Sequence, residues 1–148
     1  MRIILDSVEE IYDSGSTKAI RSLETDTHPT GNIIFGGDTS SIETLNPHVN
    51  TTSVIAGSSG SSGYQEGVGS SAKFRVIEGI RLWNRTLLLV SDSGNHCLRY
   101  VERMSKRTGT FVGLCSSSGF INGVGTDARL DYPIDLVPDR TNPECIDC

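Results

Sequence analysis

The chain has 148 residues, of which 36% are hydrophobic and 21% are charged, and its formal net charge is −5. This composition is that of a folded domain and not of a disordered segment. An acidic chain lacks the basic surface that neutralises phosphates, so binding to nucleic acid or to an anionic membrane surface is not expected. No apolar run reaches the ~18 residues that a membrane-spanning helix needs.

The first part of the chain predicts a set of short strands. Residues 1–19 are interpreted as a lead-in or as the end of a preceding structural unit. Within residues 20–63, Gly31–Phe35 is predicted to be a buried strand, and Ile42–Leu45 and Thr52–Ala56 are predicted to be the next two strands.

Residues 64–119 repeat this organisation more clearly. Glu78–Leu82, Thr86–Ser91, His96–Val101 and Thr110–Cys115 are predicted to be four strands. Thr86–Ser91 is almost wholly apolar, which is typical of a strand buried on both faces. The remaining residues, 120–148, are expected to form a linker and the start of a further unit.

An internal repeat relates the two units. Gly63–Phe74 recurs as Gly119–Leu130 at an offset of 56 residues without a gap, and the second copy has glycines at Gly119, Gly123 and Gly125. Four short antiparallel strands in every ~50 residues are the pattern of a β-propeller blade. The sequence therefore predicts an all-β fold, a partial propeller of about two to two and a half four-stranded blades.

The segment Leu88–Arg99 resembles the NHL repeat, in which an apolar strand is followed by Asp-x-x-Asn-His and then by an arginine on the next strand. The matching residues are Asp92, Gly94, Asn95, His96 and Arg99, and the glycines of the linker at 119–125 resemble the connection between NHL blades. The resemblance implies that Asp92 and Arg99 pair within their blade. In the first unit, the residues 56 positions earlier are Gly36 and Glu43, so that pairing is lost there.

The resemblance also implies a ring of about six blades, which at this blade length needs roughly 300 residues. An open arc exposes strand edges and blade faces. We therefore expect the chain to be part of a larger protein, or an arc that neighbouring chains complete.

Four cysteines divide into two pairs. Cys97 falls on the third predicted strand of its blade and Cys115 at the end of the fourth, where the two are expected to lie opposite each other within disulfide range. The alternative is a pair of buried free thiols. Cys145 and Cys148 form a C-x-x-C for which no second pair is present to complete a zinc site, so a disulfide is the expected fate.

Two N-glycosylation sequons, at Asn50 and Asn84, fall in predicted loops. Together with the expected disulfide they favour an extracellular or cell-surface location, with a signal peptide outside this chain. Each sequon alone is a weak signal.

No catalytic residue, metal ligand or cofactor site is predicted. The histidines stand apart from one another: His96 belongs to the turn motif, whereas His28 and His48 fall in loops. Aspartates recur at 127, 131, 135 and 139, and they are interpreted as solvated residues, with calcium binding as the alternative.

These observations favour a non-catalytic extracellular propeller that binds proteins or glycans. One alternative is a structural subunit whose open arc is completed by neighbouring copies. A second is a piece of a propeller lyase or lactonase whose metal site lies in other blades, because relatives of those kinds hold a metal in the central channel.

Overall fold

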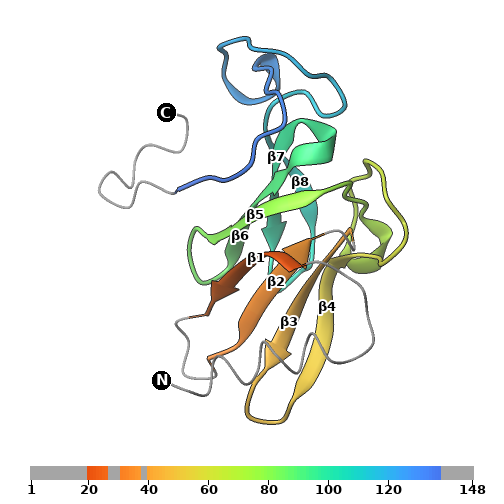
Figure 1. Ribbon diagram of the computed structural model, residues 1–148, viewed down its shortest axis with the longest axis vertical. Helices are drawn as coiled ribbons and strands as arrows, with labels where there is room; N and C mark the ends of the chain where they lie inside the picture. Colours follow the sequence, from red (N-terminus) through yellow and green to blue (C-terminus); the bar gives the residue numbers. More distant parts are fainter. Residues whose placement is uncertain (1–19, 27–30, 38–39, 138–148) are drawn as a thin grey trace.

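The computed structural model describes residues 20–26, 31–37 and 40–137, and these residues form two four-stranded antiparallel sheets (Figure 1). The first sheet contains β1 (Ile20–Thr25), β2 (Ile33–Gly37), β3 (Ser41–Asn46) and β4 (Thr51–Gly57). The second contains β5 (Ile77–Leu82), β6 (Leu87–Asp92), β7 (Cys97–Glu102) and β8 (Thr108–Val112). In each sheet, strands that are neighbours in the chain are neighbours in space. The fold is therefore all-β, and each sheet is one blade of a partial propeller.

The sequence repeat is also a repeat of backbone conformation. Two single-turn 3₁₀ helices, η1 (Gly69–Ser71) and η3 (Gly125–Asp127), lie 56 residues apart, and a third, η2 (Ser93–Asn95), joins β6 to β7. Two non-glycine residues with left-handed backbones share the offset, Ser40 at φ 57° and His96 at φ 59°. The offset of 56 residues thus relates turns as well as strands.

Gly57 ends β4 in a conformation that requires glycine. Its φ is +81°, and a Cβ built on it would lie 2.3 Å from the carbonyl oxygen of Ser40. Gly113, the residue 56 positions later, has φ +92° and turns the chain in the same way after β8. This turn directs each blade into the connection that follows it.

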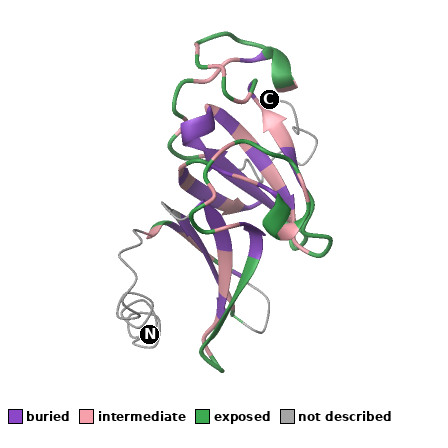
Figure 2. Ribbon diagram, turned by 90° about the vertical axis from the view of Figure 1, so that its right-hand side faces the viewer, coloured by how far each residue is buried: buried purple, intermediate pink, exposed green. Residues whose placement is uncertain are grey.

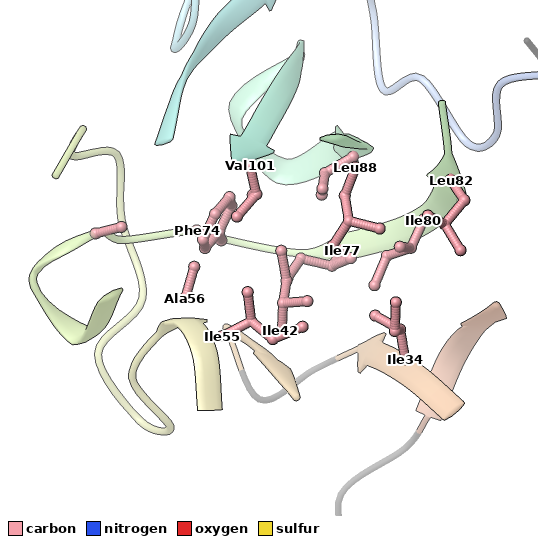
Figure 3. Close-up of a cluster of buried hydrophobic side chains, with 12 residues drawn as sticks. Ile34, Ile42, Ile55, Ala56, Phe74, Ile77, Ile80, Leu82, Leu88 and Val101 are labelled. Atoms are coloured by element: carbon pink, nitrogen blue, oxygen red, sulfur yellow. The ribbon is translucent and has the colours of Figure 1, made fainter. Parts of the chain in front are cut away.

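The main hydrophobic core lies between the two blades (Figure 3). Ile34 and Ile42 of the first sheet are completely buried, as are Ile77, Ile80 and Leu88 of the second. In the view of Figure 3 the side chains of the first sheet point upward at those of the second. β1 also lies beside β5, where the amide of Ile80 donates a hydrogen bond of 2.8 Å to the hydroxyl of Ser22. The blades are thus joined by one apolar interface.

β6 is buried on both of its faces, as the sequence predicted. Five of its residues, Leu88–Asp92, are buried and only Leu87 is partly exposed. In the first sheet the face turned away from the second blade carries a smaller cluster of Ile33, Phe35 and Leu45. The second strand of each blade, β2 or β6, therefore has no solvent face, which explains its apolar sequence.

Two details of the predicted strands are wrong. The fourth strand of the second blade is Thr108–Val112 and not Thr110–Cys115, because the left-handed turn at Gly113 ends it. In the first blade, Gly36 pairs with Ile42, whereas Leu98, the residue 56 positions after Ile42, pairs with Ser91. Gly36 is therefore the counterpart of Ser91 and not of Asp92, because β2 is displaced by one residue relative to β6.

Beyond the second blade, the chain forms a hairpin over residues 119–130. The amide of Gly119 donates to the carbonyl of Leu130 at 3.1 Å, and Ile121 and Arg129 form an antiparallel bridge. This hairpin stands at the top of Figure 1 and is largely exposed in Figure 2. Residues 131–137 then run beside β5, where Asp135 forms an ion pair with Arg81, but the structure assigns no strand to them.

No helix in the described part of the chain is both long enough and apolar enough to cross a membrane.

Candidate functional site

Asp92, at the end of β6, is completely buried and holds three hydrogen-bond donors. Its Oδ1 accepts from the backbone amide of Arg75 at 3.0 Å, and its Oδ2 accepts from Asn95 Nδ2 at 2.9 Å and from Arg99 Nη1 at 3.2 Å. Burial raises the pKa of Asp92, and the donors of Arg75, Asn95 and Arg99 act against that rise. The carboxyl group ties the turn, the next strand and the preceding connection together.

Arg99, on β7, is also completely buried. Besides its pairing with Asp92, its Nε donates to the carbonyl of Gly109 on β8 at 3.2 Å. Its Nη1 and Nη2 donate at 3.3 Å to the carbonyls of Lys73 and Gln65 in the connection that precedes the blade. The guanidinium therefore donates hydrogen bonds both to β8, the outer strand of the blade, and to the connection that precedes the blade.

Two aromatic rings enclose the same guanidinium. The Cζ atom of Arg99 lies 4.9 Å from the ring centroid of Tyr64 and 5.0 Å from that of Phe74. Both rings belong to the connection at residues 63–74 and are held in cation–π range. The Asp92–Arg99 pair is thus a clasp that fixes this connection to the second blade, which is a structural role.

The remaining residues of the turn motif are structural as well. Asn95 Nδ2 donates to the carbonyl of Gly63 at 2.9 Å. A Cβ on Gly94 would lie 2.8 Å from Arg75 Cγ. The Nδ1 atom of His96 accepts a hydrogen bond from the backbone amide of Tyr132 at 3.1 Å, so this histidine anchors the chain where it leaves the hairpin at residues 119–130.

The three linker glycines shape the 119–130 hairpin. Gly125 has φ +55° and begins η3. A Cβ on Gly123 would lie 2.8 Å from the backbone nitrogen of Ala128, and one on Gly119 would lie 3.1 Å from Arg129 Cβ. These residues allow the two arms of the hairpin to approach closely, and none of them faces a cavity.

Cys97 and Cys115 form a disulfide with a Cα–Cα distance of 5.0 Å. The expected geometry was wrong in one respect, because Cys115 lies beyond the end of β8 and not opposite Cys97 on it. The left-handed turn at Gly113 brings Cys115 back over β7. Cys145 and Cys148 lie outside the described residues.

The two sequon asparagines lie in exposed turns. Asn50 precedes β4 with a left-handed backbone at φ 47°. Asn84 joins β5 to β6, and its Oδ1 accepts hydrogen bonds from Thr86 N, Thr86 Oγ1 and Leu87 N. That carbonyl oxygen organises the turn.

A cavity of about 440 Å³ opens between the two blades, and we call it the interblade cleft. The first blade and its β1–β2 segment contribute Asp26, Asn32, Thr44, Ser53, Val54 and Ile55. The turns of the second blade contribute Arg85, Arg103, Met104 and Lys106. The volume lies within the range of small-molecule sites, which is roughly 300–1,000 Å³.

Cations outnumber carboxylates along this cleft. Arg103 forms an ion pair with Asp26 and also donates to the carbonyl of Arg85 at 2.8 Å. Lys106 Nζ donates to the carbonyl of Val54 at 3.0 Å, and the exposed Arg85 makes no side-chain hydrogen bond within the described ranges. Three cations thus meet one carboxylate, although the chain as a whole is acidic.

Two buried polar atoms of residues that line the cleft have no partner. Asn32 Oδ1 and Thr44 Oγ1 make no hydrogen bond, and Ser91 Oγ is the other such atom in the described part of the chain. An unpaired buried polar group costs about 1–3 kcal/mol, so such groups point to a missing partner. Both oxygens are shielded from solvent, so the groups that the cleft itself presents are its cations and the exposed hydroxyl of Ser53.

A smaller cavity of about 240 Å³ adjoins the cleft and shares Asp26 and Arg85 with it. Trp83 and Asn84, from the β5–β6 turn, line it together with Glu24. Trp83 is partly exposed there, and it is the single tryptophan of the chain.

Metal ligands do not gather at any of these places. Within residues 20–26, 31–37 and 40–137, no group of three or more histidine, cysteine, aspartate or glutamate residues is arranged to hold an ion. Asp135 pairs with Arg81, so this aspartate has a protein partner, and Asp131 lies 3.2 Å from His96 Nδ1. His48 sits in the turn after β3, and His28 lies outside the described residues.

Sequence reasoning found the clasp, the turn motif and the disulfide pair, but it missed the interblade cleft. The cleft is formed by residues of β3 and β4 facing two turns of the other blade, so its members are up to about 80 positions apart. One signal was available, because Arg85, Arg103 and Lys106 lie in predicted turns of a chain with few basic residues.

No protein-family model matches the sequence, and no curated protein matches it. Among solved structures, two auxiliary nutrient binding proteins have a similar fold. The one from Bacteroides thetaiotaomicron VPI-5482 gives a TM-score of 0.64 at 21% identity, and the one from Bacteroides ovatus ATCC 8483 gives 0.67 at 16% identity. In both comparisons 80% of this chain and 32% of the other chain are covered.

A protein of unknown function from Bacteroides thetaiotaomicron VPI-5482 gives a TM-score of 0.63 at 21% identity, with 75% of this chain and 30% of that chain covered. The chain thus spans about a third of the length of the solved structures that it matches. At these identities the comparisons show the fold, and they place two four-stranded blades within longer chains.

Proposed function

We propose that this chain is a non-catalytic, extracytoplasmic propeller module that binds a glycan or a protein through the interblade cleft. The observation that carries the proposal is the gathering of three cations around one cavity of about 440 Å³ in a chain that is acidic as a whole. The disulfide supports a location outside the reducing cytoplasm. The name of the auxiliary nutrient binding proteins that share the fold agrees with a binding role.

The blade organisation that we propose keeps the NHL-type repeat. Residues 20–63 form one blade, 64–119 form the next, and 120–148 lead into a further one, with 1–19 as the lead-in. The clasp supports the boundary between residues 63 and 64, because Arg99 holds the connection at residues 63–74 to the blade that follows it. We propose glycans at Asn50 and Asn84 only for expression in a host that has N-glycosylation.

A cleft-filling variant tests the binding role. Ser53 is an exposed residue of β4 that lines the cleft, and Ser53→Trp is expected to occlude it. Thr51, on the same strand, is also exposed but does not line the cleft, so Thr51→Trp is the matched control. Binding of the full chain to immobilised glycan and protein arrays should survive in Thr51→Trp and fall in Ser53→Trp. Equal binding by the two variants would place the binding surface elsewhere.

A second role, an arc completed by neighbouring chains, is favoured by the 119–130 hairpin. Phe120 is 87% exposed, and Ile121 and Val124 are exposed as well. The corresponding hairpin at residues 63–74 is covered on one side by β8, where the amide of Thr108 donates to the carbonyl of Gly67 at 2.9 Å. Tyr64, the counterpart of Phe120 in the first hairpin, is 43% exposed, so the hairpin at residues 119–130 presents more of this aromatic position than the first one does.

Sedimentation velocity tests this second role. If neighbouring copies cover the hairpin, Phe120→Ser should shift the protein to the monomer. Met104→Ser is the control, because Met104 is also 87% exposed but lies in the β7–β8 turn. A wild-type protein that is monomeric at high micromolar concentration would contradict completion by copies of itself.

A further inference from the structure

The charged residues that line the interblade cleft favour a ligand of opposite charge. Arg103 is neutralised by Asp26, which leaves Arg85 and Lys106 as uncompensated cations that line the cleft. Glu24 lines the adjoining smaller cavity and not the cleft itself. A neutral ligand would leave both cations without a counter-charge, whereas a carboxylate would pair with them.

The first blade supplies groups of a different kind. Asn32 Oδ1 accepts hydrogen bonds, while the hydroxyl of Thr44 can donate or accept. Both atoms are buried and unpaired, and Ser53 adds a hydroxyl from the neighbouring strand. The two oxygens are shielded from solvent, so Ser53 is the hydroxyl that this wall offers to a ligand, and the opposite wall suits a ligand with a negative charge.

Trp83 adds an aromatic surface at the end of the cleft that Arg85 borders. It lines the smaller cavity, which shares Asp26 and Arg85 with the cleft. The apolar face of a sugar ring packs against such a surface, because an aromatic side chain offers a rigid apolar area at low entropic cost. The two cavities together measure about 240 and 440 Å³, so a ligand of more than one ring has room to extend between them.

We propose that the interblade cleft binds a carboxylate-bearing oligosaccharide. Its carboxylate lies between Arg85 and Lys106, a hydroxyl meets Ser53, and a neighbouring ring lies against Trp83. This inference rests on the proposed binding function and narrows it to one ligand class.

Trigalacturonic acid is the probe, and titration calorimetry with the full chain measures its affinity. Fluorescence of Trp83 gives a second readout without interference, since the chain has no other tryptophan. The fully methyl-esterified trisaccharide has the same rings without the charges, and sodium acetate has the carboxylate without the sugar. The acid form is expected to bind, to weaken as salt is raised, and to exceed both comparison ligands by at least about tenfold.

Two adjacent residues provide a matched pair of variants. Lys106 lines the cleft and its neighbour Arg107 does not, although both are exposed cations in the β7–β8 turn. Lys106→Gln and Arg85→Gln should each weaken binding of the acid by about tenfold or more, and Arg107→Gln should leave it unchanged. Arg85→Gln removes no hydrogen bond of the described structure, so a folding defect is not expected from it.

The outcomes separate this inference from the proposed function. If the methyl ester binds as tightly as the acid, or if Lys106→Gln behaves like Arg107→Gln, the anionic ligand class is wrong while binding through the cleft stands. If no form of the trisaccharide binds but the array signals respond to Ser53→Trp, the inference is again overturned and the proposed function is kept. If neither experiment detects binding at the cleft, both are wrong.

Discussion

At the scale of single residues, the most constrained group is the pair of Asp92 and Arg99. Both side chains are completely excluded from solvent. Two buried charges are tolerated because backbone and side-chain partners satisfy the guanidinium and the carboxylate together. Removing one partner leaves the other charged and unpaired, so the cost of a single substitution is larger than the net contribution of the pair.

Arg99→Met should therefore lower the free energy of unfolding by about 3–5 kcal/mol. The double variant Asp92→Asn/Arg99→Met should cost less than the sum of the two single variants, because it leaves no unpaired charge. Urea denaturation followed by Trp83 fluorescence measures both quantities. Arg107→Met, at an exposed cation, is the control and should change stability by less than about 0.5 kcal/mol. Additive losses would contradict a coupled pair.

Glu66 makes the stability of the protein depend on pH. Partial burial acts to raise the pKa of its carboxyl group, but the hydroxyl and amide of Thr110, followed by Arg99 and Tyr64, lower it below the ordinary value of 4.5. A lowered pKa in the folded state means that the carboxylate stabilises the fold above its unfolded pKa. That stabilisation is lost as the pH falls through the folded pKa.

Glu66→Gln should thus destabilise the protein at pH 7 and have no effect at a pH below the folded pKa. Urea midpoints of both proteins, measured from pH 7 down to about 3, test this expectation. In a Thr110→Val background the effect of Glu66→Gln at pH 7 should shrink, because the two strongest donors that lower the pKa come from Thr110 and one of them is removed. A difference that grows as the pH falls would have the wrong sign.

At the scale of elements, the disulfide joins β7 to the segment that follows β8. It links residues 18 positions apart and closes the outer hairpin of the second blade beyond its last ladder bond. The first blade has serines at the two corresponding positions, Ser41 and Ser59, so no disulfide closes its outer hairpin there. The two blades thus differ in how their outer edges are fixed.

Cys97→Ala/Cys115→Ala should lose about 3 kcal/mol of stability, as expected for a loop of this length. The midpoint of thermal unfolding measures the loss. Dithiothreitol should lower the midpoint of the wild-type protein to near that of the double variant, and the double variant itself should not respond to dithiothreitol. A response in the variant would mean that other cysteines contribute to folding.

At the scale of the whole molecule, the two blades share one core. The main cluster takes Ile34 and Ile42 from the first sheet and Ile77 and Ile80 from the second, so neither blade buries its inner face alone (Figure 3). Elements that share a core unfold together. The described structure is accordingly one cooperative unit of two blades.

Ile77→Ala should lower the stability of both blades by about 2–5 kcal/mol. Hydrogen exchange measured by mass spectrometry should show faster exchange in β2 and β3 as well as in β6 and β7. Leu45→Ala is the comparison, because Leu45 belongs to the smaller cluster on the opposite face of the first sheet. A change confined to the second blade in Ile77→Ala would contradict a shared core.

Much of this architecture was accessible from the sequence because it is local or periodic. The all-apolar run at residues 87–90 predicted a strand with no solvent face, and the offset of 56 residues between Gly69 and Gly125 predicted a structural repeat. These features depend on backbone conformation and on hydrophobic pattern, and both are set by neighbouring residues of the same segment. The Asp92–Arg99 pair followed from a resemblance and not from such a pattern.

Other features were decided only by tertiary structure, since they depend on how segments distant in the chain meet. The position of Cys115 depends on the left-handed turn at Gly113, and strand opposition alone gave the wrong geometry. The interblade cleft exists because the turns that carry Arg85 and Lys106 face the strand that carries Thr44. The sequence predicted the blades and most of their strands, whereas the packing of one blade on the other created the cleft. The reason is that hydrophobic pattern and turn residues act within one segment of the chain, whereas the surface left open between two blades depends on every side chain that lines it.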